Sequence, residues 1–321
     1  MSVSISRLVI LSVIVGLFAH FGPLFVPVLS SYFSVLNINA YFSGLKTPFF
    51  NFTNKATDSS ALNSNNSNYN NSTHDETSCP QHNYRIQLIS SSPLLIYIHD
   101  FVSEQESKAI IEQGTPLLER SPITGDGARA ESRTSRSAPL DQEGSVEVKC
   151  VLNRAREVMG GIWGEKDRMD GVGVGQLVSY GSGEGFDLHT DWFSRPKILT
   201  EDLEKGRKRM YNRLATFFVI LEAEEIEEKS GETWFPFVEA AGGSGEGTEM
   251  YYWRKHEDGG VAVRPVAGNA VFWINLLESD NGNGTVIGDR RLVHAGLPVR
   301  GEGAKKKGMN IWPRRFFGPD A

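Results

Sequence analysis

Cysteine is scarce in this chain of 321 residues, which contains only Cys79 and Cys150. Two cysteines exclude a disulfide-rich scaffold and a zinc site built from four thiolates. Any metal ion must therefore be held by histidine and carboxylate side chains. Whether the two cysteines pair stays open here, because a disulfide needs Cα atoms about 4.4–6.8 Å apart, which a sequence does not reveal.

An excess of basic residues is also absent. The chain has 33 Lys and Arg against 39 Asp and Glu, which gives a net charge of −6. Because a nucleic-acid-binding protein neutralises phosphates with a basic surface, we expect no nucleic acid partner. Hydrophobic residues make up 40% of the chain, enough to build a core, so wholesale disorder is excluded as well.

Charges are missing from a long apolar segment near the amino terminus. Leu8 to Leu29 spans 22 residues without a charge, long enough to cross a bilayer core of about 30 Å as a helix. The pattern predicts a transmembrane signal anchor over residues 8–30. A cleaved signal peptide is the alternative, although its apolar region is usually only about 7–15 residues long.

The flanks of this segment predict its orientation. Arg7 lies in a short tail over residues 1–7, and a positive charge before the span favours a cytosolic amino terminus. The remainder of the chain is then translocated. We therefore expect a single-pass type II protein of the endoplasmic reticulum membrane with its folded domain in the lumen.

Apolar residues are rare again in residues 31–83, which we interpret as a luminal stalk. Between residues 51 and 78, Asn, Ser and Thr supply 18 of 28 residues. Such a segment has too few apolar side chains to offset the entropy lost when a chain becomes ordered. Possible N-glycosylation sites, which suit a luminal glycoprotein, occur at Asn51, Asn65, Asn70 and Asn71, and at Asn283 in a predicted loop.

Residues 84–321 show the periodicities of a folded domain. Leu94 to Ile98 reads as a buried strand, and Ser103 to Glu106 forms a capping box that opens a helix. Residues 145–159 place apolar side chains at helical intervals, which predicts an amphipathic helix ending at Gly160-Gly161.

Short β-rich runs broken by Gly and Pro dominate the rest of the domain. Many such runs predict a sandwich or barrel, so the expected fold is mainly β with flanking helices, an α+β domain. Residues 200–212, rich in alternating charges, are expected to form a solvated insertion. The expected strands are Gly175–Tyr180, Leu214–Leu221, Thr233–Phe237, Val261–Val266, Ala270–Leu276, Arg291–Pro298 and Gly308–Trp312.

Two of the seven histidines stand in settings that suit metal binding. His189 and Asp191 are two residues apart, so on an extended segment both side chains point to one face. His294 lies in a later short strand and would complete a two-histidine, one-carboxylate triad if the strands face each other. Such a triad leaves positions open on Fe(II) for a bidentate co-substrate and O₂, whereas a structural zinc site has four protein ligands.

These residues, with the motifs around them, resemble the prolyl 4-hydroxylase group of 2-oxoglutarate- and Fe(II)-dependent dioxygenases. The resemblance covers roughly residues 90–315 and implies a double-stranded β-helix core of the jelly-roll or cupin type. It also implies that His189, Asp191 and His294 are the iron ligands. The motifs stand in the family's order: QLVSYGSGEGFDLHTDWF (residues 176–193), RLATFFVILE (213–222), GETWFP (231–236), VRPVAGNAVFW (263–273), HAGLPV (294–299) and GMNIW (308–312).

The family also has a lysine that pairs with the distal carboxylate of 2-oxoglutarate. The loop after Val299 is about two residues longer here than in the family, so counting forward from His294 is unreliable. Counting back from Asn310 selects Lys306, which shares strand parity with Asn310. The neighbouring Lys305 and Lys307 would then point to the other face, although either one stays an alternative.

The resemblance implies roles for three further residues. Tyr180 and Thr216 match contacts of 2-oxoglutarate, and Trp312 matches an aromatic residue beside the substrate proline. All three also suit ordinary strand or core positions. The implied cofactors and co-substrates are Fe(II), 2-oxoglutarate, O₂ and L-ascorbate.

The implied activity is hydroxylation of peptidyl proline with release of succinate and CO₂. A proline-containing peptide or protein is then the substrate, and the N-terminal helix is the contact with the membrane. The same chemistry on lysine or a small molecule stays open, as does a noncatalytic binding module of the same fold. The sequence reveals neither the natural substrate nor the hydroxylated position, and it leaves the oligomeric state and any partner subunit undetermined.

Overall fold

The computed structural model describes residues 50–52, 79–121, 133–141, 143–163, 171–241, 251–278 and 286–318. The predicted cytosolic tail and membrane anchor, most of the predicted stalk, and the glycosylation motifs at Asn65, Asn70, Asn71 and Asn283 lie outside these residues. Among the helices that are described, none combines the length and apolar character needed to cross a bilayer.

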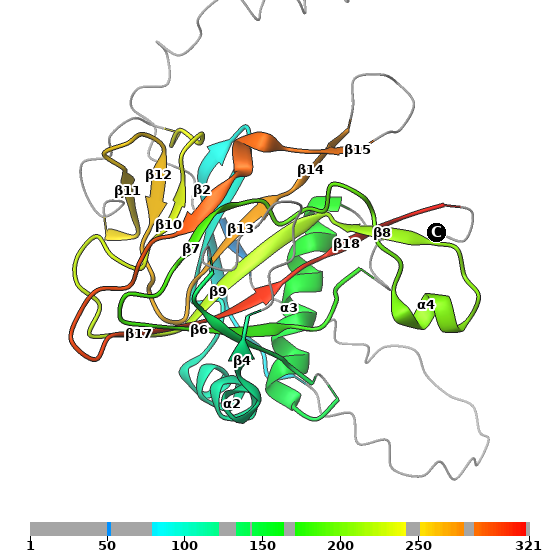
Figure 1. The fold of residues 1–321 in the computed structure, drawn as a ribbon, viewed down its shortest axis with the longest axis horizontal. Coiled ribbons are helices and arrows are strands. Elements are labelled where there is room, and N and C mark those ends of the chain that lie inside the picture. Colours follow the sequence, from blue (N-terminus) through cyan, green and yellow to red (C-terminus); the bar gives the residue numbers. More distant parts are fainter. Residues whose placement is uncertain are drawn as a thin grey trace, which may run out of the picture. The chain divides into compact units, whose positions relative to one another are not determined.

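A nine-stranded antiparallel sheet forms one layer of the fold (Figure 1). Its central strands come from distant parts of the chain, so the sheet joins the start of the domain to its end. In spatial order the strands are β1 (Phe50–Phe52), β2 (Tyr84–Ser91), β3 (Leu94–His99), β13 (Ala270–Ile274), β9 (Ala215–Glu224), β17 (Lys305–Ile311), β6 (Gln176–Gly181), β5 (Arg136–Pro139) and β4 (Glu119–Arg120).

A five-stranded sheet forms the second layer. In spatial order its strands are β11 (Trp253–Lys255), β12 (Val261–Val263), β10 (Thr233–Phe235), β16 (His294–Gly296) and β7 (Phe186–His189). Along the chain, β6 and β7, then β9 and β10, then β12 and β13, and finally β16 and β17 alternate between the two sheets. The fold is therefore mainly β, and this strand order is compatible with the predicted double-stranded β-helix.

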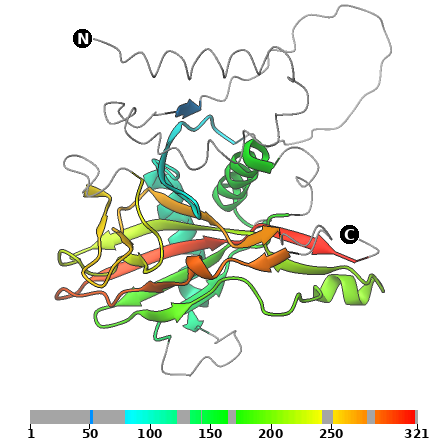
Figure 2. The ribbon, with the colours of Figure 1, turned by 90° about the horizontal axis from the view of Figure 1, so that it is seen from above.

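Side-chain alternation on β9 separates two cores. Phe217 and Val219 pack in a cluster with residues of helices α2 (Glu104–Gly114) and α3 (Val146–Trp163), whereas Phe218 and Ile220 pack in a cluster with residues of the five-stranded sheet. Successive strand residues point to opposite faces, so β9 is buried on both. The helices therefore cover the outer face of the nine-stranded sheet, and Figure 2 shows α3 outside the sheets.

The helix predictions are confirmed in position, with one correction at an end. The capping box is present, because Glu106 N donates to Ser103 Oγ at 3.2 Å while the Glu106 carboxylate accepts from Ser103 N at 2.8 Å. Helix α3, however, continues past Gly160-Gly161 to Trp163. Glycine keeps both backbone hydrogen-bonding groups, so it continues a helix at a cost of roughly 1 kcal/mol relative to alanine instead of ending it.

Two antiparallel ribbons and a short helix extend from one side of the sheets (Figure 1). The ribbons are β14 (Leu276–Glu278) with β15 (Val286–Gly288), and β8 (Met210–Arg213) with β18 (Arg314–Phe317); helix α4 spans Thr200–Glu204, and a 3-10 turn, η6, spans Arg290–Leu292.

The segment of residues 200–212 was predicted to be solvated, but part of it is buried. The side chain of Asp202 is fully buried and pairs with Arg207 at 2.6 Å and with Arg209 at 2.9 Å. Two guanidinium groups compensate the desolvation of this carboxylate, which is the condition for burying a charge. The insertion is therefore held in place by an internal ion-pair cluster.

The predicted stalk also contacts the domain at two points. Strand β1 pairs with β2, and Cys79 forms a disulfide with Cys150 of α3, with a Cα–Cα distance of 5.4 Å. The cysteine pairing left open by the sequence is thus resolved. Because the disulfide links residues 71 positions apart, it restricts the unfolded chain and stabilises the domain.

Replacing Cys79 with alanine is expected to lower the free energy of unfolding by about 3 kcal/mol. Chemical denaturation of the purified protein measures this change as a lower midpoint. The wild-type protein under reducing conditions should unfold at the same midpoint as the variant. An unchanged midpoint in both cases would show that the disulfide does not constrain the unfolded state.

Candidate active site

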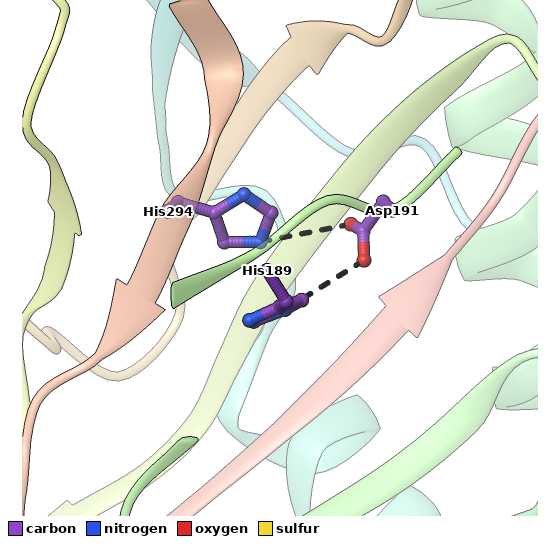
Figure 3. Close-up of side chains that lie close together, drawn as sticks. All are labelled: His189, Asp191 and His294. Carbon is purple, nitrogen blue, oxygen red and sulfur yellow. Dashed lines mark ion pairs between the residues drawn. The ribbon is translucent and has the colours of Figure 1, made fainter. Parts of the chain in front are cut away.

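The three predicted metal ligands meet between two paired strands. His189 is the last residue of β7, His294 is the first residue of β16, and the two residues lie opposite each other in the antiparallel register. Asp191 follows β7 by two residues, and Figure 3 shows its carboxylate turned toward both imidazoles. One ligand atom from each residue lies within 4.8 Å of the others.

The imidazole rings are oriented by backbone carbonyl groups. Nδ1 of His189 lies 2.7 Å from the Asp187 oxygen, and Nδ1 of His294 lies 2.9 Å from the Leu292 oxygen, so each Nδ1–H donates to a carbonyl. Each Nε2 is then left as the basic nitrogen, which is the form that binds a metal. Both Nε2 atoms lie 3.9 Å from an oxygen of Asp191.

The local electrostatics favour the protonation states that ligation requires. Burial, together with the neighbouring His294, lowers the pKa of His189 and keeps it neutral. Burial alone would raise the pKa of Asp191, but His294, His189 and Arg213 lower it below its ordinary value. A neutral imidazole and an ionised carboxylate are thus available without deprotonation by the metal.

This donor set fits an open Fe(II) centre. Two imidazole nitrogens and one carboxylate form a three-ligand face, which leaves positions for other molecules, whereas a structural zinc site is closed by a fourth protein ligand. Within the described residues, this is the one cluster of at least three His, Cys, Asp or Glu side chains that could hold a metal ion.

Thr216, which the resemblance predicts to contact 2-oxoglutarate, lies against Asp191. Its hydroxyl donates to Asp191 Oδ2 at 2.8 Å and accepts from Asn275 Nδ2 at 2.9 Å. Thr216 is fully buried on β9, and a buried hydroxyl needs hydrogen-bond partners, which these two residues supply. This geometry indicates that Thr216 orients the carboxylate, and its contact with 2-oxoglutarate stays a prediction.

Replacing Thr216 with valine is therefore expected to weaken Fe(II) binding by about 10- to 100-fold, the usual effect of removing a group that orients a metal ligand. Anaerobic titration with Fe(II) measures the affinity. Thr216→Ser keeps the hydroxyl and should bind iron nearly as tightly as the wild type. Equal weakening in both variants would point to a packing effect instead of a hydrogen bond to Asp191.

A cavity of about 110 Å³ adjoins the three ligands and reaches Lys306. A void that holds one water needs only about 10–15 Å³, so this cavity has room for a small organic acid. Lys306 is 2% exposed, and its Nζ donates to the Gly231 carbonyl oxygen at 2.6 Å. No carboxylate pairs with Lys306 within the described residues, so an acidic ligand in the cavity would supply the missing countercharge.

The register of β17 separates the three consecutive lysines. Lys306 points inward, whereas the Lys305 side chain is 60% exposed and Lys307 pairs with Glu222 at 2.8 Å. Burial lowers the pKa of the Lys306 ammonium to about 7. Tyr180 lies opposite Lys306 on β6, and its ring centroid is 5.3 Å from Lys306 Nζ, so both line the cavity.

Trp312 lines the same cavity, against an arginine to which sequence analysis gave no role. The guanidinium carbon of Arg213 lies 3.5 Å from the centroid of the Trp312 ring, and Arg213 Nη1 donates to the Asp191 carbonyl oxygen at 3.3 Å. Arg213 lies in one of the family motifs, so the sequence drew attention to this residue. Its stacking on Trp312 depends on tertiary structure and was not predicted.

Other cavity residues were missed entirely. Arg133 is buried, with its guanidinium carbon 4.8 Å from the centroid of the Phe186 ring and its Nε donating to Ser135 Oγ at 3.1 Å. It lies 56 positions before His189, in a segment without a motif, so no sequence signal pointed to it. Further residues that line the cavity are Gln176, Phe218, Thr233 and Asn310.

Comparison with known proteins supports this arrangement. Residues 175–314 match the 2OG-Fe(II) oxygenase superfamily, a range that contains the three ligands and Lys306. The chain is 29% identical over 212 residues to the prolyl 4-hydroxylase subunit alpha-2 of Gallus gallus, a match that covers 65% of this chain and 32% of that protein. It is 28% identical over 222 residues to prolyl 4-hydroxylase 1 of Arabidopsis thaliana, covering 68% of each protein.

The animal subunits are much longer than the matched region, so the chain spans about a third of the length of these relatives. Among solved structures, a viral collagen prolyl hydroxylase from Paramecium Bursaria Chlorella virus-1 in complex with 2OG is 21% identical. That match covers 68% of this chain and 95% of that chain, with a TM-score of 0.42.

The family match falls on the segment that carries the iron-ligand cluster and the buried lysine. Residues 175–314 are therefore those of a 2OG-Fe(II) oxygenase domain, a superfamily that uses Fe(II), 2-oxoglutarate and O₂, and the chain is similar to prolyl 4-hydroxylases.

Proposed function

We propose that this protein hydroxylates proline residues in a peptide or protein substrate. The observation that carries the proposal is the single cavity that joins the cluster of His189, Asp191 and His294 to the buried cation of Lys306. The relatives named as prolyl 4-hydroxylases support proline as the target.

The roles of the residues follow from their positions. Fe(II) bound with 2-oxoglutarate and O₂ supplies the oxidising chemistry, in which the oxo acid becomes succinate and CO₂ and a substrate C–H bond is hydroxylated. His189, Asp191 and His294 hold the iron, and Thr216 keeps the Asp191 carboxylate in place. Lys306 and Tyr180 hold the distal carboxylate of 2-oxoglutarate, and the low polarity around Lys306 strengthens that ion pair.

The substrate side of the cavity has different chemistry. Trp312 and Arg213 form a stacked pair next to Asp191, and the flat ring of Trp312 suits contact with the ring of a proline. We also propose that the two sheets form a double-stranded β-helix, whose facing strands bring both ends of the cavity together. L-Ascorbate, typical of prolyl 4-hydroxylases, is proposed as the reductant.

We further propose that the enzyme works in the lumen of the endoplasmic reticulum, held by an anchor over residues 8–30. The disulfide between Cys79 and Cys150 supports an oxidising compartment, because disulfides persist in the secretory pathway and are rare in the cytosol. Protease protection in sealed microsomes tests this proposal. Digestion of the folded domain without detergent would refute it.

The activity is tested with the full chain, reconstituted anaerobically with Fe(II) and then given O₂, 2-oxoglutarate, ascorbate and proline-containing peptides. Mass spectrometry detects hydroxyproline, and succinate is measured in parallel. Hydroxyproline with a matching amount of succinate establishes the proposed function. Succinate that depends on a lysine peptide or small molecule, without hydroxyproline, would replace the proline substrate and keep the oxygenase.

The lowered pKa of Lys306 predicts a pH dependence. Below a pH of about 7 the amine is protonated and attracts the co-substrate carboxylate, and above this value it loses its charge. The KM for 2-oxoglutarate should therefore stay constant below about pH 7 and rise at higher pH. In Lys306→Met the KM should be high at every pH, and a rise with pH that persists in this variant would assign the titration to another group.

A further inference from the structure

A second cavity, a groove of about 770 Å³, lies between the two ribbons. Leu277 and Ile287 of the β14–β15 ribbon and Phe317 of the β8–β18 ribbon form apolar walls. Leu277 is 36% exposed and Ile287 is 52% exposed, so these apolar side chains are open to a partner. Trp192 also lines the groove, and its buried indole Nε1–H has no acceptor in the part of the chain that is described.

The groove adjoins the catalytic cavity. Trp192 follows Asp191, and Asn212 precedes Arg213, so two groove residues are chain neighbours of two cavity residues. Asn212 fixes the wall by donating from Nδ2 to the Phe193 carbonyl at 2.8 Å and accepting from Phe193 N at 2.8 Å. The groove and the catalytic cavity are therefore lined by neighbouring residues of the same two segments.

The charges around the groove are mostly positive. Arg290 lines it, and Arg195 and Lys197 lie in the segment of residues 192–197 that forms one wall; all three are exposed. None of the three pairs with a carboxylate among the described residues. Lys197 Nζ lies 4.2 Å from the Phe193 ring centroid, which places its charge over the wall.

The acidic residue that lines the groove is already paired with an arginine. Among the described residues that line the groove, Asp289 is the one acidic residue, and Arg291 pairs with it through Nε at 2.9 Å and Nη2 at 2.7 Å. This basic groove lies on a chain whose net charge is −6, so the positive charge is concentrated locally. Such a patch attracts acidic partners and repels basic ones.

We propose that the groove binds an acidic segment of the substrate, so that the enzyme prefers prolines flanked by Asp or Glu residues. The inference rests on the proposed proline hydroxylation and adds a sequence preference to it. Arg195, Lys197 and Arg290 meet the substrate carboxylates, and the apolar walls hold the peptide backbone and aliphatic stems.

The test uses pairs of short labelled peptides that share one proline and differ only in Asp and Glu against Asn and Gln on its flanks. Fluorescence anisotropy with the metal-free full chain should show about 10-fold tighter binding of the acidic peptide at low salt, from several exposed charge pairs of modest strength. High salt should remove this advantage, because it screens exposed charges.

Variants assign the preference to the groove. In the double variant Arg195→Gln and Arg290→Gln the advantage of the acidic peptide should fall to about twofold, whereas Lys108→Gln, an exposed change on α2, should keep it. Equal binding of both peptides by the wild type would overturn the inference. An advantage that survives in the double variant would overturn it as well.

Turnover separates this inference from the proposed function. If both peptides yield hydroxyproline with equal kcat/KM and bind equally, the function stands and the groove has no such role. If neither peptide is hydroxylated but the acidic one binds through Arg195 and Arg290, the groove binds acidic peptides and the proline activity is wrong.

Discussion

Asp191→Ala is expected to lower turnover by at least about 1,000-fold, a loss equivalent to about 4 kcal/mol of transition-state stabilisation. The variant removes the one carboxylate of the cluster and leaves two imidazoles, which bind Fe(II) weakly because no other carboxylate among the described residues lines the cavity. Succinate formation with saturating 2-oxoglutarate measures the loss, and circular dichroism checks that the fold is kept.

The chain offers a matched control for this experiment. Asp187 lies on β7 two residues before His189, and its side chain is exposed, so Asp187→Ala removes a nearby carboxylate without touching the cluster. This control should retain near wild-type activity. Similar losses in both variants, or full activity in Asp191→Ala, would remove Asp191 from the iron site.

Lys306→Met should raise the KM for 2-oxoglutarate by about 100-fold and leave Fe(II) affinity nearly unchanged. Methionine fills most of the same space without a charge, so the main loss is a charge-assisted hydrogen bond in a buried site, worth about 2–3 kcal/mol. Steady-state kinetics with varied 2-oxoglutarate measures this change, and anaerobic titration measures the iron affinity.

Lys305→Met and Lys307→Met are the controls, because their side chains lie on the other face of β17 and approach Glu224 and Glu222. Each should change the KM by less than about twofold, as expected for ion pairs near the surface. A large effect of Lys305→Met with none of Lys306→Met would mean that another lysine holds the co-substrate.

The sequence predicted those parts of the site that depend on local periodicity. The spacing of His189 and Asp191 put both on one side of an extended segment, and the parity of Lys306 with Asn310 placed its side chain inside, as the structure shows. Both inferences need only the alternation of a strand. The main strands and the capped helix were likewise predicted from local sequence patterns.

Contacts between distant segments were beyond the sequence. The contact of Thr216 with Asp191 depends on how β9 packs against the segment after β7, and no local pattern encodes that packing. Arg133 and the disulfide partner of Cys79 depend in the same way on tertiary structure. The continuation of α3 through two glycines shows packing prevailing over local propensity.

The alternation of strands between two sheets has a consequence for chemical selectivity. The histidines belong to the five-stranded sheet and Lys306 to the nine-stranded sheet, so the two ends of the cavity are held by different layers. Facing sheets pack about 10 Å apart, a spacing set by the whole core and not by a flexible loop. We therefore expect the two layers to set a fixed acid length and to disfavour oxo acids one methylene longer or shorter than 2-oxoglutarate.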